Sequence, residues 1–329
     1  MKILFITSNR LGDAVLSTGL LAWMIKHYAD DNPKFTIVCG PYAAGLFNNV
    51  PQARLIILKK QKWNRHWLGV WKQCRKTKWD LIVDLRNSIV SRLLRSKRRV
   101  YGGLHTGKHK VIENADVLHI KQPEAPAIWL SAKAEAEAEK LLPKDRPLLA
   151  LAPAANWPSK QWAAENFAAL AQRLTADDGL LKGAAVMVLA DASEREQLQP
   201  LLAALPQDRI EIFGKDLQLV AACLKRAALF VGNDSGLMHL SAAVGAPTLG
   251  LFGPGYEEVY GPWGDHCATV RTKESREELL ARLVTSGNPN LNLMGGLDVG
   301  MVVDAAQKLL EKIANPNPSE ALAEPPPAP

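Results

Sequence analysis

The sequence predicts an α/β protein made of two doubly wound domains that face each other across a cleft. Short apolar runs alternate with amphipathic stretches along the chain, which is typical of strands and helices that alternate around a parallel sheet. This rhythm stops at residues 143–147, PKDRP, and then starts again. The length of 329 residues is also more typical of two hydrophobic cores than of one.

The first half contains five expected strands and three expected helices. The strands are expected at residues 3–6, 35–40, 54–58, 81–85 and 98–102. One helix is expected at 13–28, a second between the third and fourth strands, and a third at 132–142, where Ala and Glu give high helix propensity. PKDRP then predicts a boundary between a domain at 1–145 and a domain at 146–314.

The second half repeats the alternation with more continuous apolar runs. Strands are expected at 148–153, 184–190, 210–213, 228–233 and 248–253. Helices are expected at 161–175, 194–204, 216–226 and 236–245. Continuous apolar runs are typical of parallel strands that are buried on both faces. The Pro-rich tail at 315–329 is expected to be disordered.

The two halves differ strongly in charge. Residues 1–145 contain 25 Lys or Arg against 12 Asp or Glu, whereas residues 146–329 contain 15 against 21. The segment 59–79, KKQKWNRHWLGVWKQCRKTKW, has eight basic residues and no acid. The first half is therefore expected to face an anionic partner: a membrane surface, an anionic substrate or a nucleic acid.

Three tryptophans in this basic segment recur every four residues. Trp63, Trp67 and Trp71 would form one stripe on a helix. The stripe fits a helix face packed against the sheet and equally fits an interfacial anchor.

The cysteines and the apolar runs exclude several protein classes. Four scattered cysteines without a CxxC pair argue against a disulfide framework or a zinc site and favour a reducing compartment. The apolar run at the N-terminus is too short for a signal peptide, and no run of 18 apolar residues is present. A cytoplasmic protein without a metal site is expected, and the isolated histidines are expected to be surface or satisfied residues.

One segment of the second half has the pattern of a diphosphate site. In VGNDSGLMHLSAAVGAPTLGLFGP, residues 231–254, a buried strand ends at Asn233 and a helix starts after the turn Asp234–Gly236. A helix N-terminus offers free backbone N–H groups and a partial positive charge. Ser235 and His239 are four residues apart and share a helix face. A simple N-cap role for Asp234 or Ser235 fits the pattern equally well.

Two further residues follow expected strands. Asp13 starts the first helix, so it would either face the cleft as a general base or act as a helix cap. Lys160, in the loop after the first strand of the second half, would complement a phosphate or be a solvated lysine. The absence of a GxGxxG motif disfavours a dinucleotide-dependent dehydrogenase.

Together these residues resemble glycosyltransferase family 9, the bacterial ADP-heptose:lipopolysaccharide heptosyltransferases. The resemblance covers roughly residues 1–270. It is carried by three motifs: MKILFITSNRLGD, PSKQWAAENFAAL and GNDSGLMHLSAAVGAPTLGLFGP. It implies a GT-B type fold with two Rossmann-like domains, acceptor-side and donor-binding, and an inverting, metal-independent transfer that needs no cofactor. The donor is then an ADP-sugar that carries a heptose or a related sugar, and the acceptor is an anionic lipopolysaccharide core or lipid A–Kdo.

The resemblance also implies roles for single residues. Asp13 is the expected catalytic base and Lys160 the expected contact of the donor phosphates. The other expected donor-site residues are Glu194 at the ribose, Met238 beside the nucleotide, and Asp234, Ser235, Gly236 and His239. Before its acid the family often has a Gly-Gly-Pro or Gly-Ala turn, whereas this chain has ADAS at 190–193.

The basic half is expected to contact the membrane rather than nucleic acid. Because lipid A cores are anionic, it would dock peripherally at the inner face of the cytoplasmic membrane. The expected docking residues are Lys60, Arg65, Lys72, Arg75 and Lys76. Two alternatives stay open: a GT-B-shaped nucleotide-sugar epimerase or hydrolase, and a non-enzymatic protein that binds anionic membranes or nucleic acid. Transfer to a lipid or glycan acceptor would distinguish the first reading from both.

Overall fold

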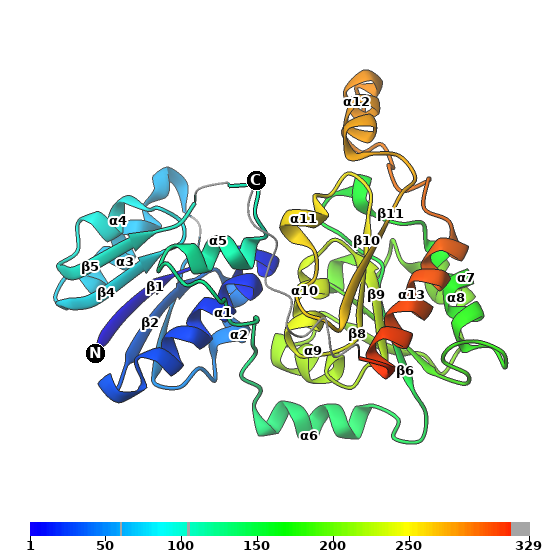
Figure 1. The fold of residues 1–329 in the computed structure, drawn as a ribbon, viewed down its shortest axis with the longest axis horizontal. Coiled ribbons are helices and arrows are strands. Elements are labelled where there is room, and N and C mark those ends of the chain that lie inside the picture. The colour runs from blue at the N-terminus through cyan, green and yellow to red at the C-terminus, as the bar shows by residue number, and fades with distance from the viewer. Residues whose placement is uncertain (60, 104–105, 317–329) are drawn as a thin grey trace.

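The structure, a computed structural model, describes residues 1–59, 61–103 and 106–316 and contains two α/β domains side by side (Figure 1). Each domain has its own parallel sheet with helices on both faces. The doubly wound, two-domain α/β prediction is confirmed. In this part of the chain, no helix combines the length and apolar character needed to cross a membrane. Most of the Pro-rich tail, residues 317–329, lies outside the described residues.

The N-terminal sheet has five parallel strands in the order β3-β2-β1-β4-β5. Its strands are β1 (Lys2–Ile6), β2 (Lys34–Cys39), β3 (Ala53–Ile57), β4 (Trp79–Asp84) and β5 (Ser96–Tyr101). Its helices are α1 (Leu11–His27), α2 (Ala44–Phe47), α3 (His66–Cys74), α4 (Ile89–Arg92) and α5 (Lys110–Asp116). The strand order reverses between β1 and β4, which is where an open α/β sheet offers a binding crevice.

The C-terminal sheet has six parallel strands in the order β11-β10-β9-β6-β7-β8. Its strands are β6 (Leu148–Ala152), β7 (Ala185–Ala190), β8 (Ile210–Phe213), β9 (Leu229–Asn233), β10 (Thr248–Phe252) and β11 (Cys267–Arg271). Four of them, β6, β7, β9 and β10, are buried at every residue, as their continuous apolar runs predict. The order reverses here between β6 and β9.

The helices of the C-terminal domain cover both faces of this sheet. They are α7 (Ala164–Thr175), α8 (Gln199–Ala204), α9 (Leu217–Leu224), α10 (Gly236–Ala243), α11 (Glu257–Tyr260), α12 (Arg276–Ser286) and α13 (Val299–Ala314). The helix expected at 194–204 begins as a short 3-10 turn, Ala192–Glu194, and α8 starts only at Gln199, with a proline in its first turn. The α12 helix projects away from the rest of the domain (Figure 1).

The helix α6 (Ala132–Leu141) lies between the two sheets in sequence but packs against the C-terminal domain. Its buried Ala134 and Ala138 face α9, and Glu135 pairs with Lys225 at 2.8 Å. A division into domains at 1–145 and 146–314 therefore follows sheet membership and stays a proposal.

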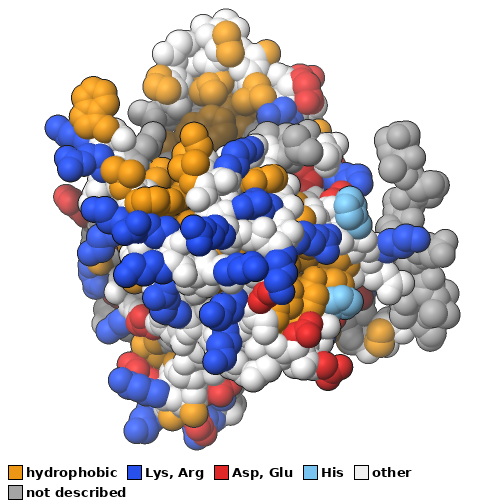
Figure 2. Space-filling view, turned by 90° about the vertical axis from the view of Figure 1, so that its left-hand side faces the viewer, with side chains coloured by type: hydrophobic (Ala, Val, Ile, Leu, Met, Phe, Trp, Pro, Cys, Tyr) orange, Lys and Arg blue, Asp and Glu red, His pale blue; other side chains and the backbone are white. Residues whose placement is uncertain are grey.

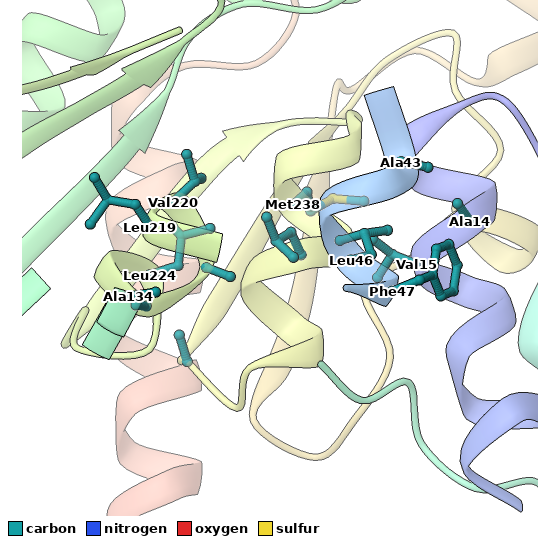
Figure 3. Close-up of a cluster of buried hydrophobic side chains, with 14 of the residues drawn as sticks. Ala14, Val15, Ala43, Leu46, Phe47, Ala134, Leu219, Val220, Leu224 and Met238 are labelled. Atoms are coloured by element: carbon teal, nitrogen blue, oxygen red, sulfur yellow. The ribbon is translucent and has the colours of Figure 1, made fainter. Parts of the chain in front are cut away.

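A single apolar cluster joins the two domains (Figure 3). It includes Ala14, Val15, Leu46 and Phe47 from α1 and α2, and Leu219, Val220 and Met238 from α9 and α10. Beside it the buried amide of Gln218 in α9 donates to the Gly45 carbonyl at 2.8 Å and accepts from Asn49 Nδ2 at 2.8 Å. Apolar packing and this amide join the two domains.

The tryptophan stripe is wrong at its first member. Trp63 precedes α3 in a short 3-10 turn, its φ is +56°, and its side chain is 92% exposed. His66 Nδ1 accepts from the Gln61 N–H at 3.2 Å, which closes a turn before the helix begins. Trp67 and Trp71 do lie on α3, half-buried against the core under the sheet. The predicted stripe on one helix therefore consists only of Trp67 and Trp71.

Candidate active site

A cavity of about 1020 Å³ lies between the two domains, where the carboxyl ends of both sheets meet. It brings together the loops that follow β1, β6, β7 and β9, including both points of strand-order reversal. Its lining includes Asn9, Arg10, Gly12, Asp13, Tyr42, Lys160, Asp191, Glu194, Asp234, Ser235, Gly236, His239 and Tyr260. Asp13 and six of the seven expected donor-site residues therefore share one cavity, and Met238 is the exception.

The N-termini of α1 and α10 meet at this cavity. Neither N-cap residue, Arg10 nor Ser235, makes a side-chain capping bond, so the first backbone N–H groups of both helices have no cap. A Cβ on Gly12 would lie 2.9 Å from His239 Cδ2, and a Cβ on Gly236 would lie 2.8 Å from Leu11. The two glycines therefore allow the helix starts to approach closely. Two positive helix ends side by side favour a bound anion.

The C-terminal wall of the cavity is held by a compact set of bonds. Lys160, which ends a 3-10 turn after β6, forms an ion pair with the carboxylate of Asp234. The neighbouring Asn233 accepts from the Trp162 N–H at 3.1 Å and donates to the Pro153 carbonyl at 2.7 Å. These bonds join the loop after β6 to the end of β9. They place one cation and one carboxylate at the start of α10.

Ser235 and His239 lie one turn apart on α10, as the spacing predicts. Ser235 occupies the N-cap position, yet its Oγ is buried and has no hydrogen-bond partner among the described residues. His239 is 4% exposed, and its Nδ1 likewise has no partner in that part of the chain. Burial, with the nearby charges of His109 and Lys160, lowers the pKa of His239 to about 3. Its ring is therefore neutral at physiological pH.

Glu194 lies on the wall formed by the end of β7. It belongs to a capping box in which its Oε2 accepts from the Asp191 N–H at 2.7 Å and Asp191 accepts from the Ser193 N–H at 2.9 Å. Burial raises the pKa of Glu194, with the Asp191 charge adding to the shift. In this chain the ADAS sequence thus builds a cap that orients the acid.

Met238 is not where the resemblance places it. Its side chain lies on the sheet side of α10, is fully buried in the core and does not belong to the cavity lining. A Cβ on Gly250 of β10 would lie 2.5 Å from the Met238 sulfur, which shows how closely the helix packs on the sheet. On α10, Ser235 and His239 point to the cavity, whereas Met238 points to the sheet. The expectation that Met238 contacts a nucleotide is therefore corrected to a packing role.

The N-terminal wall carries the expected base. Asp13 lies in the first turn of α1, half-buried, and its Oδ2 accepts from Ser8 Oγ at 3.2 Å. Asp13 itself caps neither α1 nor another helix, because the N-cap residue of α1 is Arg10. This position leaves a carboxylate oxygen available to the cavity, as a proton acceptor requires.

The sequence did not single out Tyr260 of α11 as a cavity residue, nor His109, the N-cap of α5, as a contact between the domains. Tyr260 lines the cavity, and its pKa is raised by burial and by the Asp13 carboxylate. His109 bridges the domains: its Nε2 bonds the Gly261 carbonyl at 3.0 Å, while its Nδ1 accepts from the Val111 N–H at 3.2 Å. Both come from short helices or turns without periodicity, so no sequence signal marked them. His109 is nonetheless a satisfied histidine, as expected.

The expected docking residues lie on one face of the N-terminal domain, outside the cavity. Figure 2 shows Lys and Arg side chains spread over this face, with hydrophobic side chains among them. Arg65, Lys72, Arg75 and Lys76 are exposed along α3 and the turn after it, and Arg75 lies 4.9 Å from the centre of the Trp71 ring. Lys60 lies outside the described residues. Across residues 1–59, 61–103 and 106–316, no three His, Cys, Asp or Glu side chains gather as a metal site.

Comparisons with known proteins agree with this geometry. The family model of glycosyltransferase family 9 (heptosyltransferase) matches residues 107–285. The lipooligosaccharide heptosyltransferase 2 of Campylobacter jejuni subsp. jejuni serotype O:6 is 27% identical over 295 residues, which covers 82% of this chain and 87% of that protein.

Two solved structures share the fold. A family 9 glycosyltransferase from Veillonella parvula superposes with a TM-score of 0.78 at 21% identity, over 94% of this chain and 97% of that one. The ADP-heptose lipopolysaccharide heptosyltransferase II of E. coli gives a TM-score of 0.73 at 18% identity, over 95% and 100% of the two chains. The GT-B type fold is thereby confirmed. Because the family match spans more than half of its 329 residues, this chain belongs to glycosyltransferase family 9 and is a glycosyltransferase.

Proposed function

We propose that this enzyme transfers heptose from ADP-heptose to a lipopolysaccharide core or lipid A–Kdo acceptor, with inversion and without a metal ion. One observation carries the proposal: Asp13 on one wall of the cavity faces the Lys160–Asp234 pair and the start of α10 on the other. The names of the Campylobacter relative and the E. coli structure supply the sugar, the nucleotide and the class of acceptor. The N-terminal domain would then be the acceptor side and the C-terminal domain the donor side.

The chemistry is a single displacement at the anomeric carbon. An Asp13 oxygen accepts the proton of an acceptor hydroxyl as that oxygen attacks the carbon. The new C–O bond forms as the bond to the β-phosphate oxygen breaks, and ADP leaves with the electron pair. Attack from the side opposite the leaving group inverts the anomeric configuration once. Closing both groups in one cavity supplies the orientation that the step needs.

The leaving diphosphate would be stabilised by protein groups alone. The uncapped N–H groups at the start of α10 and the Lys160 ammonium are the donors for the phosphate oxygens. Glu194, which its capping box orients, would accept from the ribose hydroxyls. Because these groups are already in position, ADP should raise the melting temperature equally in EDTA and in Mg²⁺. A shift that requires the divalent ion would contradict the metal-independent reaction.

Transfer itself is tested with ADP-heptose and a lipopolysaccharide that ends before the heptose region. The expected product is the acceptor extended by one heptose, and its anomeric configuration, read by NMR, should be opposite to that of the donor. Release of free heptose with the acceptor unchanged would instead indicate a hydrolase or an epimerase.

The basic face is proposed to dock on the inner face of the cytoplasmic membrane. Exposed Trp63 and Leu68 lie among its cations, a composition that suits an anionic interface. Binding to anionic phospholipid vesicles should fall steeply with salt, because the Debye length shrinks from about 10 Å at 0.1 M to about 3 Å at 1 M. The triple change Lys72→Glu, Arg75→Glu, Lys76→Glu should nearly abolish it, and vesicle binding that ignores both would contradict docking.

A further inference from the structure

Arg86 occupies the point in the N-terminal sheet where the strand order reverses. It follows β4 directly, and Asn9 follows β1, so the two side chains flank the crevice between these strands. Arg86 Nη1 donates to Asn9 Oδ1 at 3.0 Å, and Asn9 lines the cleft cavity. In the other domain the equivalent point, between β6 and β9, carries Lys160 and Asp234. The fold thus places a cation at each of its two points of strand-order reversal.

The position of Arg86 is fixed on two sides. Its guanidinium carbon lies 5.2 Å from the centre of the Trp67 ring. Trp67 in turn packs against the apolar core of the N-terminal domain. Its backbone N–H donates to Asp84 Oδ1 at 3.0 Å. Asp84 is fully buried, and its second oxygen accepts from the Ser88 N–H at 2.8 Å and from Ser88 Oγ at 2.6 Å. This turn presents the guanidinium in one orientation.

The charge of Arg86 has no carboxylate partner among the described residues. Asp84, its nearest acid, is occupied by backbone and Ser88 donors, and no ion pair in the described part of the chain includes Arg86. Asn9 is the one described side chain that accepts from its guanidinium. A guanidinium that stacks on an aromatic ring and keeps its other edge open is the usual geometry for binding a carboxylate or a phosphate.

We propose that Arg86 binds an oxyanion of the acceptor, either the carboxylate of an acidic sugar or a phosphate, and so selects acidic acceptors. This inference rests on the proposed function, since it takes the acceptor hydroxyl to lie at Asp13. Asn9 links the two, because it lies four residues before Asp13, in the turn that leads into α1, and lines the same cavity. Trp67 then supports the guanidinium. Arg86 itself lies beside the cavity and reaches it through Asn9, whereas the expected docking residues Arg65, Lys72, Arg75 and Lys76 lie on the basic face.

The test compares Arg86→Gln with Arg95→Gln. Arg95 precedes β5 at the opposite, amino edge of the same sheet and is exposed, so it is a matched loss of charge. With ADP-heptose as donor, Arg86→Gln should raise the KM for a core lipopolysaccharide acceptor about 10- to 100-fold. The stabilisation by ADP should stay unchanged, and Arg95→Gln should behave as the unmodified enzyme. Arg86→Lys should restore part of the loss, because it keeps the charge and loses the fork.

Chemically altered acceptors identify the oxyanion. The unmodified enzyme is assayed with the intact acceptor, with a dephosphorylated one and with a carboxyl-reduced one. The treatment that raises KM for the unmodified enzyme but not for Arg86→Gln marks the group that Arg86 binds. If neither treatment changes KM, or if Arg86→Gln keeps the KM of the unmodified enzyme for the intact acceptor, the inference is wrong while the proposed function stands.

A second readout keeps the inference separate from the proposed function. If the unmodified enzyme transfers no heptose, the proposed function fails, and Arg86 is then judged by calorimetry with deacylated core oligosaccharide and ADP-loaded protein. Binding that Arg86→Gln abolishes and Arg95→Gln preserves supports the inference; equal binding, or none by the unmodified protein, overturns it. Should Arg86→Gln unfold, as monitored by circular dichroism, Asn9→Ala and Arg86→Lys replace it, with weaker acceptor binding expected and unchanged binding contradictory.

Discussion

The two walls of the cleft hold their charged groups in different ways. On the C-terminal wall Lys160 is paired with Asp234, Glu194 is bound to a backbone N–H, and His239 is buried and uncharged. On the N-terminal wall Asp13 accepts one bond from Ser8. Beside this wall Arg86 donates to the lining residue Asn9 and has no ion pair among the described residues. The C-terminal wall is internally neutralised, whereas the N-terminal wall keeps its charges available.

This difference indicates how each wall would meet its ligand. A neutralised, hydrogen-bonded wall is preorganised for one ligand of fixed shape, such as a nucleotide diphosphate. A wall with available charges attracts a flexible, anionic ligand from a distance and tolerates more than one shape. The charge split along the chain agrees with this difference, because the residues before 146 are basic overall and those after it are acidic.

The largest effect is expected at Asp13. Asp13→Asn keeps the shape of the side chain and can still accept from Ser8, but it cannot take up a proton at neutral pH. Turnover should fall by about 10²- to 10⁴-fold, with ADP binding and melting temperature nearly unchanged. Ser8→Ala is the matched control, since it removes only the bond to Asp13 and should cost less than tenfold. An Asp13→Asn enzyme with nearly full turnover would mean that the N-terminal wall supplies no base.

The tryptophans test how firmly the N-terminal wall is built. Trp67→Ala removes a half-buried ring that packs on the core and under Arg86, so about 2 kcal/mol of stability should be lost, roughly half of the cost at a buried site. Trp63→Ala, at a side chain that is 92% exposed, should leave stability unchanged and weaken vesicle binding. Urea denaturation and vesicle sedimentation measure the two quantities. Equal stability losses would show that Trp63 packs in solution.

Acid should destabilise the protein through the C-terminal wall. The pKa of His239 is about 3 in the folded protein and about 6.5 in an unfolded chain, so the unfolded state takes up the proton first as the pH falls. The contribution of His239 is complete above about pH 6.5 and decreases toward pH 3. At pH 5 it amounts to a loss of about 2 kcal/mol relative to pH 8.

The variant His239→Gln isolates this contribution. It removes the titrating ring, so the loss of unfolding free energy between pH 8 and pH 5 should shrink by that amount. Denaturant titrations at the two pH values measure it. An unchanged pH dependence in the variant would show that His239 has the same pKa in the folded and unfolded states. The C-terminal wall would then be more accessible to water than the burial of His239 indicates.

Sequence patterns predicted the two sheets well because their strands are buried on both faces. The run AVMVLA in β7 or TLGLF in β10 leaves few alternatives to a parallel strand. In contrast β11, CATVR, is only half-buried, and α12 projects from the domain, so neither has a continuous apolar pattern and neither was predicted.

Site residues on strand-to-helix turns were also predictable, within limits. Asp13, Lys160 and Asp234 each follow a strand and meet in one cavity, as the rule for open sheets requires. The resemblance failed for Met238, which points to the sheet, and the four-residue spacing failed for Trp63, whose backbone leaves the helix. The sequence could not show Arg86 either, because its role depends on the distance to Asn9 and Trp67, which only the fold brings together.

The smallest effect is expected at Lys160, because the pairing on the C-terminal wall reduces it. A charge-assisted bond to phosphate is worth about 1.5–3 kcal/mol. Lys160 is already paired with Asp234, so a bound phosphate interacts with an ammonium group whose charge is partly compensated. Lys160→Ala should therefore weaken ADP binding by about tenfold, near the lower end of that range. Lys182→Ala, an exposed lysine paired with Asp177 at 3.3 Å, is the control and should leave ADP affinity unchanged. Calorimetry with ADP measures both. A loss of a hundredfold or more would mean that Lys160 leaves Asp234 when ADP binds. The charges of the C-terminal wall would then be as available to a ligand as those of the N-terminal wall.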